Sequence, residues 1–280
     1  MIGLLICGVL AAMTPNLDAL WDFSDPTASE RRFREALARA TGDDALVLQT
    51  QIARTHGLRK DFDKARAVLA SVEPKLKEAG PEPKARYELE MGRTYASATH
   101  PRESQTPEAK SKAREHFDSA RAIARKAGLD GLAIDAIHMM AFLDTTPADQ
   151  EKWAREALAV VTASDQPASK RWEASVRNNL GYALHQQGRY EEALAEFRKA
   201  VEIRERGTNP VATRTAHWMV AWTLRAMGRF DEALAIQLRL EKEGEAAGKP
   251  DPYVFEELSI LYRAKGDETK AKHYADRKPK

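Results

Sequence analysis

The sequence predicts an all-α protein built from repeated pairs of helices, and three observations lead to that prediction. Ala, Leu, Glu, Arg and Lys are abundant, and charged residues make up 31% of the 280 residues. The 13 prolines and 15 glycines are few, and runs of β-branched residues are scarce. Both observations favour exposed helices over sheets. Finally, one pattern of large and small apolar residues recurs along the chain, so no single large core is needed.

The N-terminal segment, residues 1–16, contains the one long apolar run, residues 1–13. It is too short to cross a bilayer, and no Lys or Arg precedes it as in a signal peptide. We therefore expect a cytoplasmic protein that does not bind a membrane. The alternative is a periplasmic protein in which residues 1–12 act as an export segment. The only cysteine, Cys7, excludes an intramolecular disulfide and a Cys-based metal site.

Residues 17–44 are predicted to cap the N-terminal end of the repeats. Asp25 followed by Pro26 is a signal for the start of a helix, and Phe33 lies where the second helix of a repeat would place it. Residues 26–41 therefore correspond to half a repeat, which covers the exposed face of the first full unit. The apolar residues expected to pack beneath this helix are Leu17, Leu20, Trp21 and Phe23.

The most regular repeat begins at Ala174. Gly188 ends its first helix in a tight turn. Gly181 on the first helix and Ala193 on the second are small, so the two helix backbones can approach closely. Large and small apolar residues share the facing sides of the two helices at Leu180, Leu184, Tyr190, Phe197 and Ala200.

The same pattern recurs along residues 45–275 and defines six units. Their starts lie near residues 46, 85, 130, 174, 214 and 252, and residues 276–280 form a polar tail. The last three units share one register, whereas the first three are looser and the one at 130 is the poorest. Residues 97–107 form an inserted loop in the second unit, after which Thr106 and Pro107 are predicted to restart the helix.

This pattern resembles the tetratricopeptide repeat, in which a Leu-Gly pair, an aromatic residue, and later Ala and Phe recur within about 34 residues. Arg177 and Leu184 depart from it, because Trp and Tyr are usual there. The units are longer than usual, since their starts lie about 38–45 residues apart. Residues 177–180 and 187–193 are also similar to kinesin-light-chain-type repeats. The resemblance implies a right-handed superhelical solenoid of about six helix pairs with an N-terminal capping helix.

The resemblance also implies where a partner binds, because the first helices of successive units line a concave groove in this family. The matching positions hold Arg54, Arg86, Arg93, Asn178, Asn179, Tyr182, His185, Trp218, Trp222 and Arg225, together with His138, Tyr253 and Arg263. Arginine forks bind carboxylates and amides bind an extended backbone, which suggests a protein or peptide with acidic or C-terminal carboxylate groups. The alternative is that the tryptophans pack between helices and the arginines pair within the chain.

No motif indicates catalysis. The sequence has no Gly-rich phosphate loop, no Gly-x-Ser-x-Gly elbow and no His-Glu-x-x-His helix. Its seven histidines stand singly, with no two at the spacing that brings side chains together on a helix, so we expect no metal and no cofactor. The net charge is +2, and acidic residues interrupt the most basic stretch, residues 263–280, so we expect no nucleic-acid binding.

We therefore expect a protein–protein interaction module or scaffold that binds a peptide segment or a partner domain in a concave groove, and no enzyme. One alternative is an envelope-associated assembly factor of the same fold, which N-terminal sequencing of the expressed protein would detect. The other alternative is a regulatory subunit of a signalling or transcriptional complex.

Overall fold

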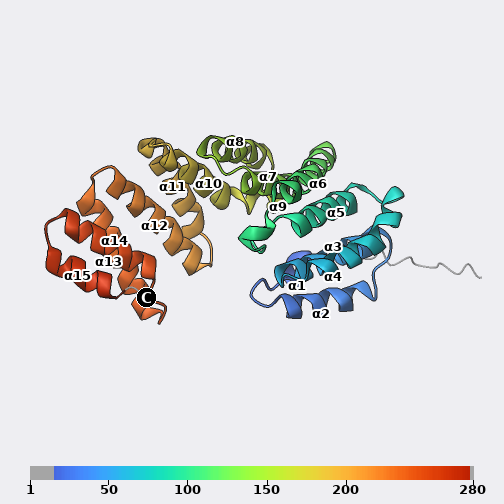
Figure 1. The fold of residues 1–280 in the computed structure, drawn as a ribbon, viewed down its shortest axis with the longest axis horizontal. Helices are drawn as coiled ribbons and strands as arrows, with labels where there is room; N and C mark the ends of the chain where they lie inside the picture. The colour runs from blue at the N-terminus through green and yellow to red at the C-terminus, as the bar shows by residue number, and fades with distance from the viewer. Residues whose placement is uncertain (1–15, 278–280) are drawn as a thin grey trace, which may run out of the picture. The chain divides into compact units, whose positions relative to one another are not determined.

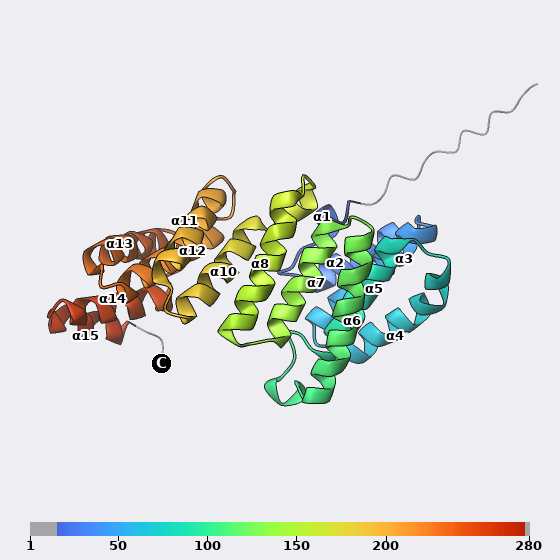
Figure 2. The ribbon, with the colours of Figure 1, turned by 90° about the horizontal axis from the view of Figure 1, so that it is seen from above.

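The computed structural model describes residues 16–277, and all the regular secondary structure in these residues is helical (Figures 1 and 2). They form thirteen α-helices of nine residues or more and no β-strand. The shorter elements are α1 (Leu17–Leu20), α9 (Pro167–Lys170) and the 3-10 helices η1 (Glu73–Lys77) and η2 (Arg102–Ser104). The apolar run of residues 1–13 lies outside the described residues. The chain divides into two compact units, unit 1 (Met1–Leu143) and unit 2 (Asp144–Lys280).

Unit 1 contains six of the longer helices, and they pack in chain order. They are α2 (Pro26–Leu37), α3 (Gly42–Leu58), α4 (Phe62–Val72), α5 (Pro81–Tyr95), α6 (Pro107–Lys126) and α7 (Asp130–Leu143). α2 packs on α3, and α3 packs on both α4 and α5, so the first helices of the units predicted at 46 and 85 contact each other. α6 packs on α5 and α7, and Figure 2 shows these three helices side by side.

Unit 2 contains the other seven longer helices. They are α8 (Pro147–Ala163), α10 (Glu173–Gln186), α11 (Tyr190–Glu205), α12 (Pro210–Ala226), α13 (Phe230–Ala246), α14 (Pro252–Ala264) and α15 (Glu268–Asp276). α8 packs on α10, and from α10 onward each helix packs on the next. The units predicted at 174, 214 and 252 are therefore the pairs α10/α11, α12/α13 and α14/α15.

The N-terminal helix α2 caps the first pair as predicted. The Asp25 side chain accepts a hydrogen bond from the backbone N–H of Ala28 at 2.9 Å, which starts the helix. Phe33 has no exposed surface and packs with Leu48 and Ile52 of α3. Leu17, Leu20 and Trp21 pack against the same cluster. Phe23 differs from the prediction, because 62% of its surface is exposed and its ring stacks on Trp21 at 4.6 Å.

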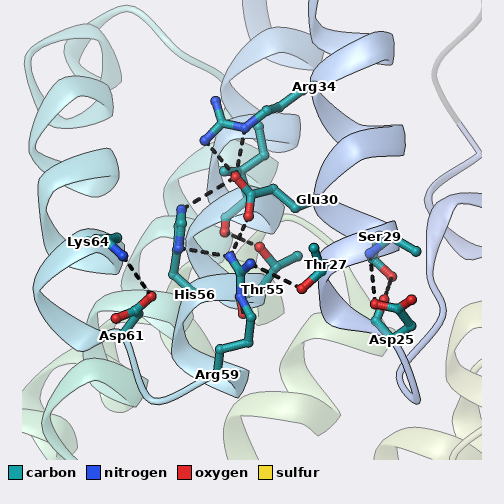
Figure 3. A network of polar contacts seen from close by, with 12 residues as sticks. Asp25, Thr27, Ser29, Glu30, Arg34, Thr55, His56, Arg59, Asp61 and Lys64 are labelled. Carbon is teal, nitrogen blue, oxygen red and sulfur yellow. Dashed lines mark hydrogen bonds and ion pairs between the residues drawn. The ribbon is translucent and has the colours of Figure 1, made fainter.

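A polar network also joins α2 to α3 (Figure 3). The Glu30 carboxylate accepts hydrogen bonds from Arg34 of its own helix and from Arg59 at the end of α3. Arg59 also donates to the hydroxyl of Thr27 at 3.3 Å, and the His56 ring lies 3.7 Å from Glu30. The cap is therefore held by charge-assisted hydrogen bonds as well as by burial of apolar surface.

The turns that join the two helices of a pair in unit 2 each contain a glycine, as predicted for Gly188. Gly188, Gly228 and Gly266 have φ of 75°, 76° and 81°, a backbone conformation that side chains with a Cβ rarely adopt. After the inserted loop, the hydroxyl of Thr106 accepts a hydrogen bond from the N–H of Ala109 at 3.2 Å, which confirms the predicted restart at α6.

The pairing of helices depends on a small residue that faces an aromatic ring. A Cβ placed on Gly181 of α10 would lie 2.8 Å from Phe197 of α11, and a Cβ on Gly92 of α5 would lie 2.5 Å from Phe117 of α6. Both phenylalanines are fully buried, so neither ring has free space into which it can move. Both units therefore contain the same close approach between a helix backbone at a glycine and the phenylalanine ring of the paired helix.

Replacing Gly181 by leucine should lower the free energy of unfolding by more than about 2 kcal/mol, because the added side chain overlaps the Phe197 ring. Ala193→Leu should have a similar effect, since Ala193 is fully buried on the facing helix. Gly181→Ala and Gly57→Ala form a matched pair, because a Cβ on Gly57 would meet nothing within 4 Å. Urea denaturation that gave the same stability for the matched pair would contradict this packing.

Candidate partner-binding site

Four aromatic side chains form a continuous row on the first helices of three successive pairs in unit 2. The Tyr182 ring of α10 stacks on Trp222 of α12 with centroids 5.9 Å apart. Trp222 stacks in turn on Trp218 of the same helix at 5.8 Å. The last member of the row is Tyr253 of α14. Its ring centroid lies 6.4 Å from that of Trp218, in a T-shaped contact. We call these four residues the aromatic row.

The aromatic row is accessible at both of its ends. Tyr182 is 38% exposed and Tyr253 is 66% exposed, whereas Trp218 and Trp222 are half-buried. Only four large apolar side chains are exposed in residues 16–277, and three of them, Tyr182, Val211 and Tyr253, lie on α10, α12 and α14. Val211 lies seven residues before Trp218, on the same side of α12. Exposed apolar surface is therefore concentrated on the first helices of unit 2.

His185 supports the aromatic row from beneath. Its ring stacks on Trp222 with centroids 3.4 Å apart, and its Nδ1 lies 3.1 Å from the Thr223 hydroxyl. The residue is 8% exposed. Burial, together with the positive charge of Arg225, lowers the pKa of His185 to about 4. The imidazole is consequently neutral at pH 7 and acts as a flat packing partner for the indole.

This lowered pKa makes stability depend on pH. Between pH 6.5 and about 4, the unfolded chain binds a proton at His185 that the folded chain does not bind, so the free energy of unfolding falls as the pH is lowered. The loss should reach roughly 2–3 kcal/mol at pH 4.5. It should be smaller in His185→Gln, which keeps a hydrogen-bonding group beside Thr223. Urea denaturation at pH 7 and pH 4.5 that showed equal losses for both proteins would contradict this interpretation.

Arg225 lies beside the aromatic row but already has a partner. Its guanidinium donates two hydrogen bonds to the carboxylate of Glu257 on α14, from Nε at 2.6 Å and from Nη2 at 2.9 Å. The Glu257 side chain is only 4% exposed. A buried carboxylate held by a bidentate arginine is a structural link between α12 and α14.

Two of the predicted site residues of unit 1, Arg54 and Arg93, belong to a second, fully ionic arrangement. Arg54 of α3 donates to Glu90 of α5 at 3.2 Å, and Arg93 donates to the same carboxylate at 2.6 Å. Arg93 also donates to Asp135 of α7. Burial alone would raise the pKa of Asp135, but the charges of Arg93 and Arg54 outweigh it and hold that pKa below its usual value. We call these four residues the charge ladder.

The remaining predicted residues lie at the sides of these two arrangements. Asn178 and Asn179 are half-buried on α10, and Asn178 lies one turn before Tyr182 on the same side of the helix. Arg86 donates to Glu82 of its own helix at 2.8 Å. Arg263 of α14 is 60% exposed and lies 3.7 Å from Glu268.

The structure thus brings half of the ten predicted residues into one neighbourhood. These five are Tyr182, His185, Trp218, Trp222 and Arg225, all in unit 2. Arg54, Arg86 and Arg93 belong to unit 1, and Arg54, Arg93 and Arg225 each bind a carboxylate from the next pair's first helix. The sequence prediction did not include Val211, because this residue precedes the predicted start of the fifth unit near residue 214. Its spacing of seven residues from Trp218 is the signal that could have placed it on the same side of the helix.

In the described part of the chain, no group of three or more His, Cys, Asp or Glu side chains is arranged to hold a metal ion. Within residues 16–277 there is also no helix with the length and apolarity that a membrane crossing requires.

A family model described as tetratricopeptide repeat matches residues 172–240, which comprise α10, α11, α12 and the first part of α13. The match covers the repeat at Leu180 and Gly181 on which the sequence prediction depended. Residues 172–240 therefore match the tetratricopeptide repeat family, and the predicted all-α architecture of repeated helix pairs is confirmed. No curated protein matches the sequence.

Solved structures share this fold at low sequence identity. The STAND protein with a tetratricopeptide repeat sensor from Pyrococcus horikoshii is 14% identical, with a TM-score of 0.67 over 90% of this chain. The match spans only 38% of the length of that protein. The Rap protein complexed with Competence and Sporulation Factor is 13% identical, with a TM-score of 0.54 over 93% of this chain and 74% of that chain.

A third structure bears on the kinesin-light-chain comparison. BtubC (BKLC) from P. vanneervenii is 16% identical, and the match covers 94% of this chain and 89% of that chain. Its TM-score of 0.42 is too low to support an argument, so the closer similarity to kinesin-light-chain-type repeats stays a prediction.

Proposed function

We propose that this protein is an interaction module that binds a peptide segment or a partner domain through the aromatic row on α10, α12 and α14. The observation that supports this proposal is the concentration of exposed Tyr182, Val211 and Tyr253 on three successive first helices. A folded domain gains nothing from leaving aromatic surface in water, and exposed apolar patches commonly mark binding sites. Tyrosine and tryptophan are also the residues most enriched at the energetic centres of interfaces.

The fold is consistent with this proposal. In tetratricopeptide proteins the first helices of successive repeats line a concave groove, and the aromatic row lies on such helices. The Rap protein, which has the same fold, is complexed with Competence and Sporulation Factor. The charge ladder of unit 1 is a poorer candidate, because each of its charges already has a partner of opposite sign.

The competing interpretation is that the aromatic row only fills space between helices. It accounts for Trp218 and Trp222, which are half-buried and contact each other. It does not account for Tyr253, because 66% of the surface of this residue is exposed and the residue therefore fills no space between helices. Exposed tyrosines are therefore the best residues for a test, since their removal should leave the fold intact.

The test uses selection from a displayed library of random linear peptides against the purified full chain. Binding of the enriched peptides should be at least about tenfold weaker to the Tyr182→Ala, Tyr253→Ala double variant, because aromatic anchors contribute 1–2 kcal/mol or more each. Phe23→Ala is the matched control, since it removes an aromatic side chain that is 62% exposed in unit 1. Circular dichroism checks that all variants are folded.

Two results would contradict the proposed function. One is that no peptide is enriched over a library passed through resin alone. The other is that enriched peptides bind the double variant and the Phe23→Ala control equally well, which would place the binding surface elsewhere. Arg225→Ala is not a suitable variant for this purpose, because it leaves Glu257 buried without its partner.

A further inference from the structure

We propose that the segment bound by the aromatic row carries an internal acidic side chain that pairs with Arg214 of α12, and that apolar residues stand on both sides of this acidic residue. This inference rests on the proposed function and specifies the chemistry of the partner. Its basis is an arginine without a partner that lies between Val211 and Trp218, two parts of the apolar surface on the same side of α12.

Arg214 lies on the side of α12 that carries the aromatic row. It follows Val211 by three residues and precedes Trp218 by four, and residues at these spacings are neighbours on one face of a helix. Val211 is 54% exposed, and Trp218 is a half-buried member of the row. A ligand that covers both Val211 and the Trp218 ring therefore passes over Arg214.

Arg214 is the one charged side chain on α10, α12 and α14 that has no partner among the described residues. No carboxylate in residues 16–277 lies within ion-pair distance of its guanidinium. The other acidic, basic and histidine side chains of these helices are engaged: Glu173 with Arg177, His217 with Glu205, Arg225 with Glu257, Arg263 with Glu268, His185 with Trp222 and Thr223, and Glu256 in an interaction of its own.

The missing partner makes Arg214 the group that an anionic ligand can use. Arg225 already donates two hydrogen bonds to Glu257, and a ligand that took them over would leave a buried carboxylate without its partner. Arg214 can donate two parallel hydrogen bonds to a ligand carboxylate without breaking any pair in the fold. Because Arg214 is half-buried, its side chain also has less freedom to lose than a fully exposed arginine.

The carboxylates around the row lie at its Tyr253 end and already have partners. Asp251 accepts a hydrogen bond from the backbone N–H of Tyr253 at 2.9 Å, and Glu257 is held by Arg225. These groups repel a second anion at Tyr253, which places the acidic side chain of the ligand at Arg214 and an apolar side chain on Tyr253. A basic segment would approach Arg214 and find each of these carboxylates occupied.

The position of Val211 favours an internal acidic residue over a C-terminal carboxylate. A chain that ended at Arg214 would cover Trp218 and leave Val211 in water. Along the helix axis, Val211 and Trp218 lie about 4.5 and 6 Å from Arg214, at about 1.5 Å per residue. Alternate side chains of an extended peptide are about 6.6 Å apart. An acidic residue with apolar residues about two positions before and after it therefore matches this surface.

The experiment uses the peptides enriched in the selection described above, because their sequences report the chemistry that the row accepts. Enriched peptides should contain Asp or Glu between apolar residues at more than twice the frequency in the starting library. Affinity of a selected peptide, measured by titrating tryptophan fluorescence, should fall at least about threefold between 50 mM and 500 mM NaCl, since salt screens an exposed ion pair. Amidation of its C-terminus should change affinity less than twofold.

Variants of Arg214 connect this preference to one side chain. Arg214→Ala should bind a selected peptide at least about fivefold more weakly than the parent, and Arg214→Lys should recover part of the loss because it retains the charge. Arg206→Ala is the matched control, since it removes the same charge from an exposed residue at the end of α11. Its affinity should change less than twofold.

A double-mutant cycle tests the pairing itself. Replacing the acidic residue of the peptide by its amide should weaken binding at least about fivefold to the parent and less than twofold to Arg214→Ala. Urea denaturation should give Arg214→Ala the same midpoint as the parent, because no pair in the fold is lost. A clearly lower midpoint would mean that Arg214 has a partner within the chain and would contradict the inference.

Three further results would overturn the inference while the Tyr182→Ala, Tyr253→Ala variant still loses binding. These are enriched peptides without an excess of acidic residues, equal binding of Arg214→Ala and Arg206→Ala, and a fivefold loss of affinity on C-terminal amidation. In each of them the proposed function stands and only the partner chemistry is wrong. Equal binding of the selected peptides to the parent and to the tyrosine double variant would instead refute the proposed function itself.

Discussion

Replacing Arg93 by methionine is expected to lower the free energy of unfolding by about 3–5 kcal/mol. Arg93 lies at the centre of the charge ladder, where it donates to Glu90 on α5 and to Asp135 on α7. The three side chains are 12%, 6% and 17% exposed, respectively. Methionine preserves much of the apolar stem but leaves Asp135 without its hydrogen-bonding partner in a site that water reaches poorly.

The matched control is Arg86→Met on the same helix. Arg86 pairs with Glu82 one turn away, and the Glu82 side chain is 38% exposed. Removing that pair should cost no more than about 0.5 kcal/mol, because water solvates the carboxylate left behind. Urea denaturation gives both values. If Arg93→Met were as mild as Arg86→Met, the charge ladder would be a solvated surface feature.

A second variant separates charge from packing. Asp135→Asn added to Arg93→Met removes the unpaired carboxylate and should recover part of the lost stability. No recovery would mean that the loss arises from the missing arginine stem. The same variants test the alternative raised from the sequence, that predicted binding arginines pair within the chain.

The fold was predictable because its signals are local. The glycines at 188, 228 and 266 end helices at positive φ, and the Leu180–Gly181 pattern fixes which sides of two helices face each other. These signals act within one repeat, so reading them requires no knowledge of distant residues. The exposure of Phe23 was not predictable, because it depends on how the short segment before α2 returns to stack on Trp21.

The site was predictable only in part, because its residues act across repeats. The family pattern places Trp218 and Trp222 on a first helix, but it does not say which carboxylate lies opposite Arg225. Glu257 is 32 residues away in sequence, and its burial follows from the packing around α14. Similarly, Arg54 and Arg93 fit the binding positions by spacing, and only the packing of α3, α5 and α7 shows that they share Glu90 and Asp135.

The repeats also reveal one position where the chain departs from its own pattern. In the fourth unit, Gly181 faces Phe197, which follows it by sixteen residues. In the first unit, Ala53 and Leu69 are separated by the same number of residues, and both are buried. In the fifth unit this spacing joins Ala221 to Gln237. Gln237 has no exposed surface, and neither its Oε1 nor its Nε2 has a hydrogen-bond partner in the described part of the chain. A buried amide without partners is costly, so this position should limit the stability of unit 2.

Gln237→Leu is therefore expected to raise the free energy of unfolding by about 1–3 kcal/mol, because leucine is close to glutamine in size and has no polar atoms to satisfy. The first unit already contains this combination, since Ala53 and Leu69 are both buried there. Gln237→Glu is the matched opposite variant: it preserves the shape but adds an ionisable group, and it should destabilise the fold by several kcal/mol at pH 7. Thermal and urea denaturation of the two variants should thus move in opposite directions from the parent. A Gln237→Leu protein that was less stable than the parent would mean that the amide makes hydrogen bonds, for example to internal water, that outweigh the cost of its burial.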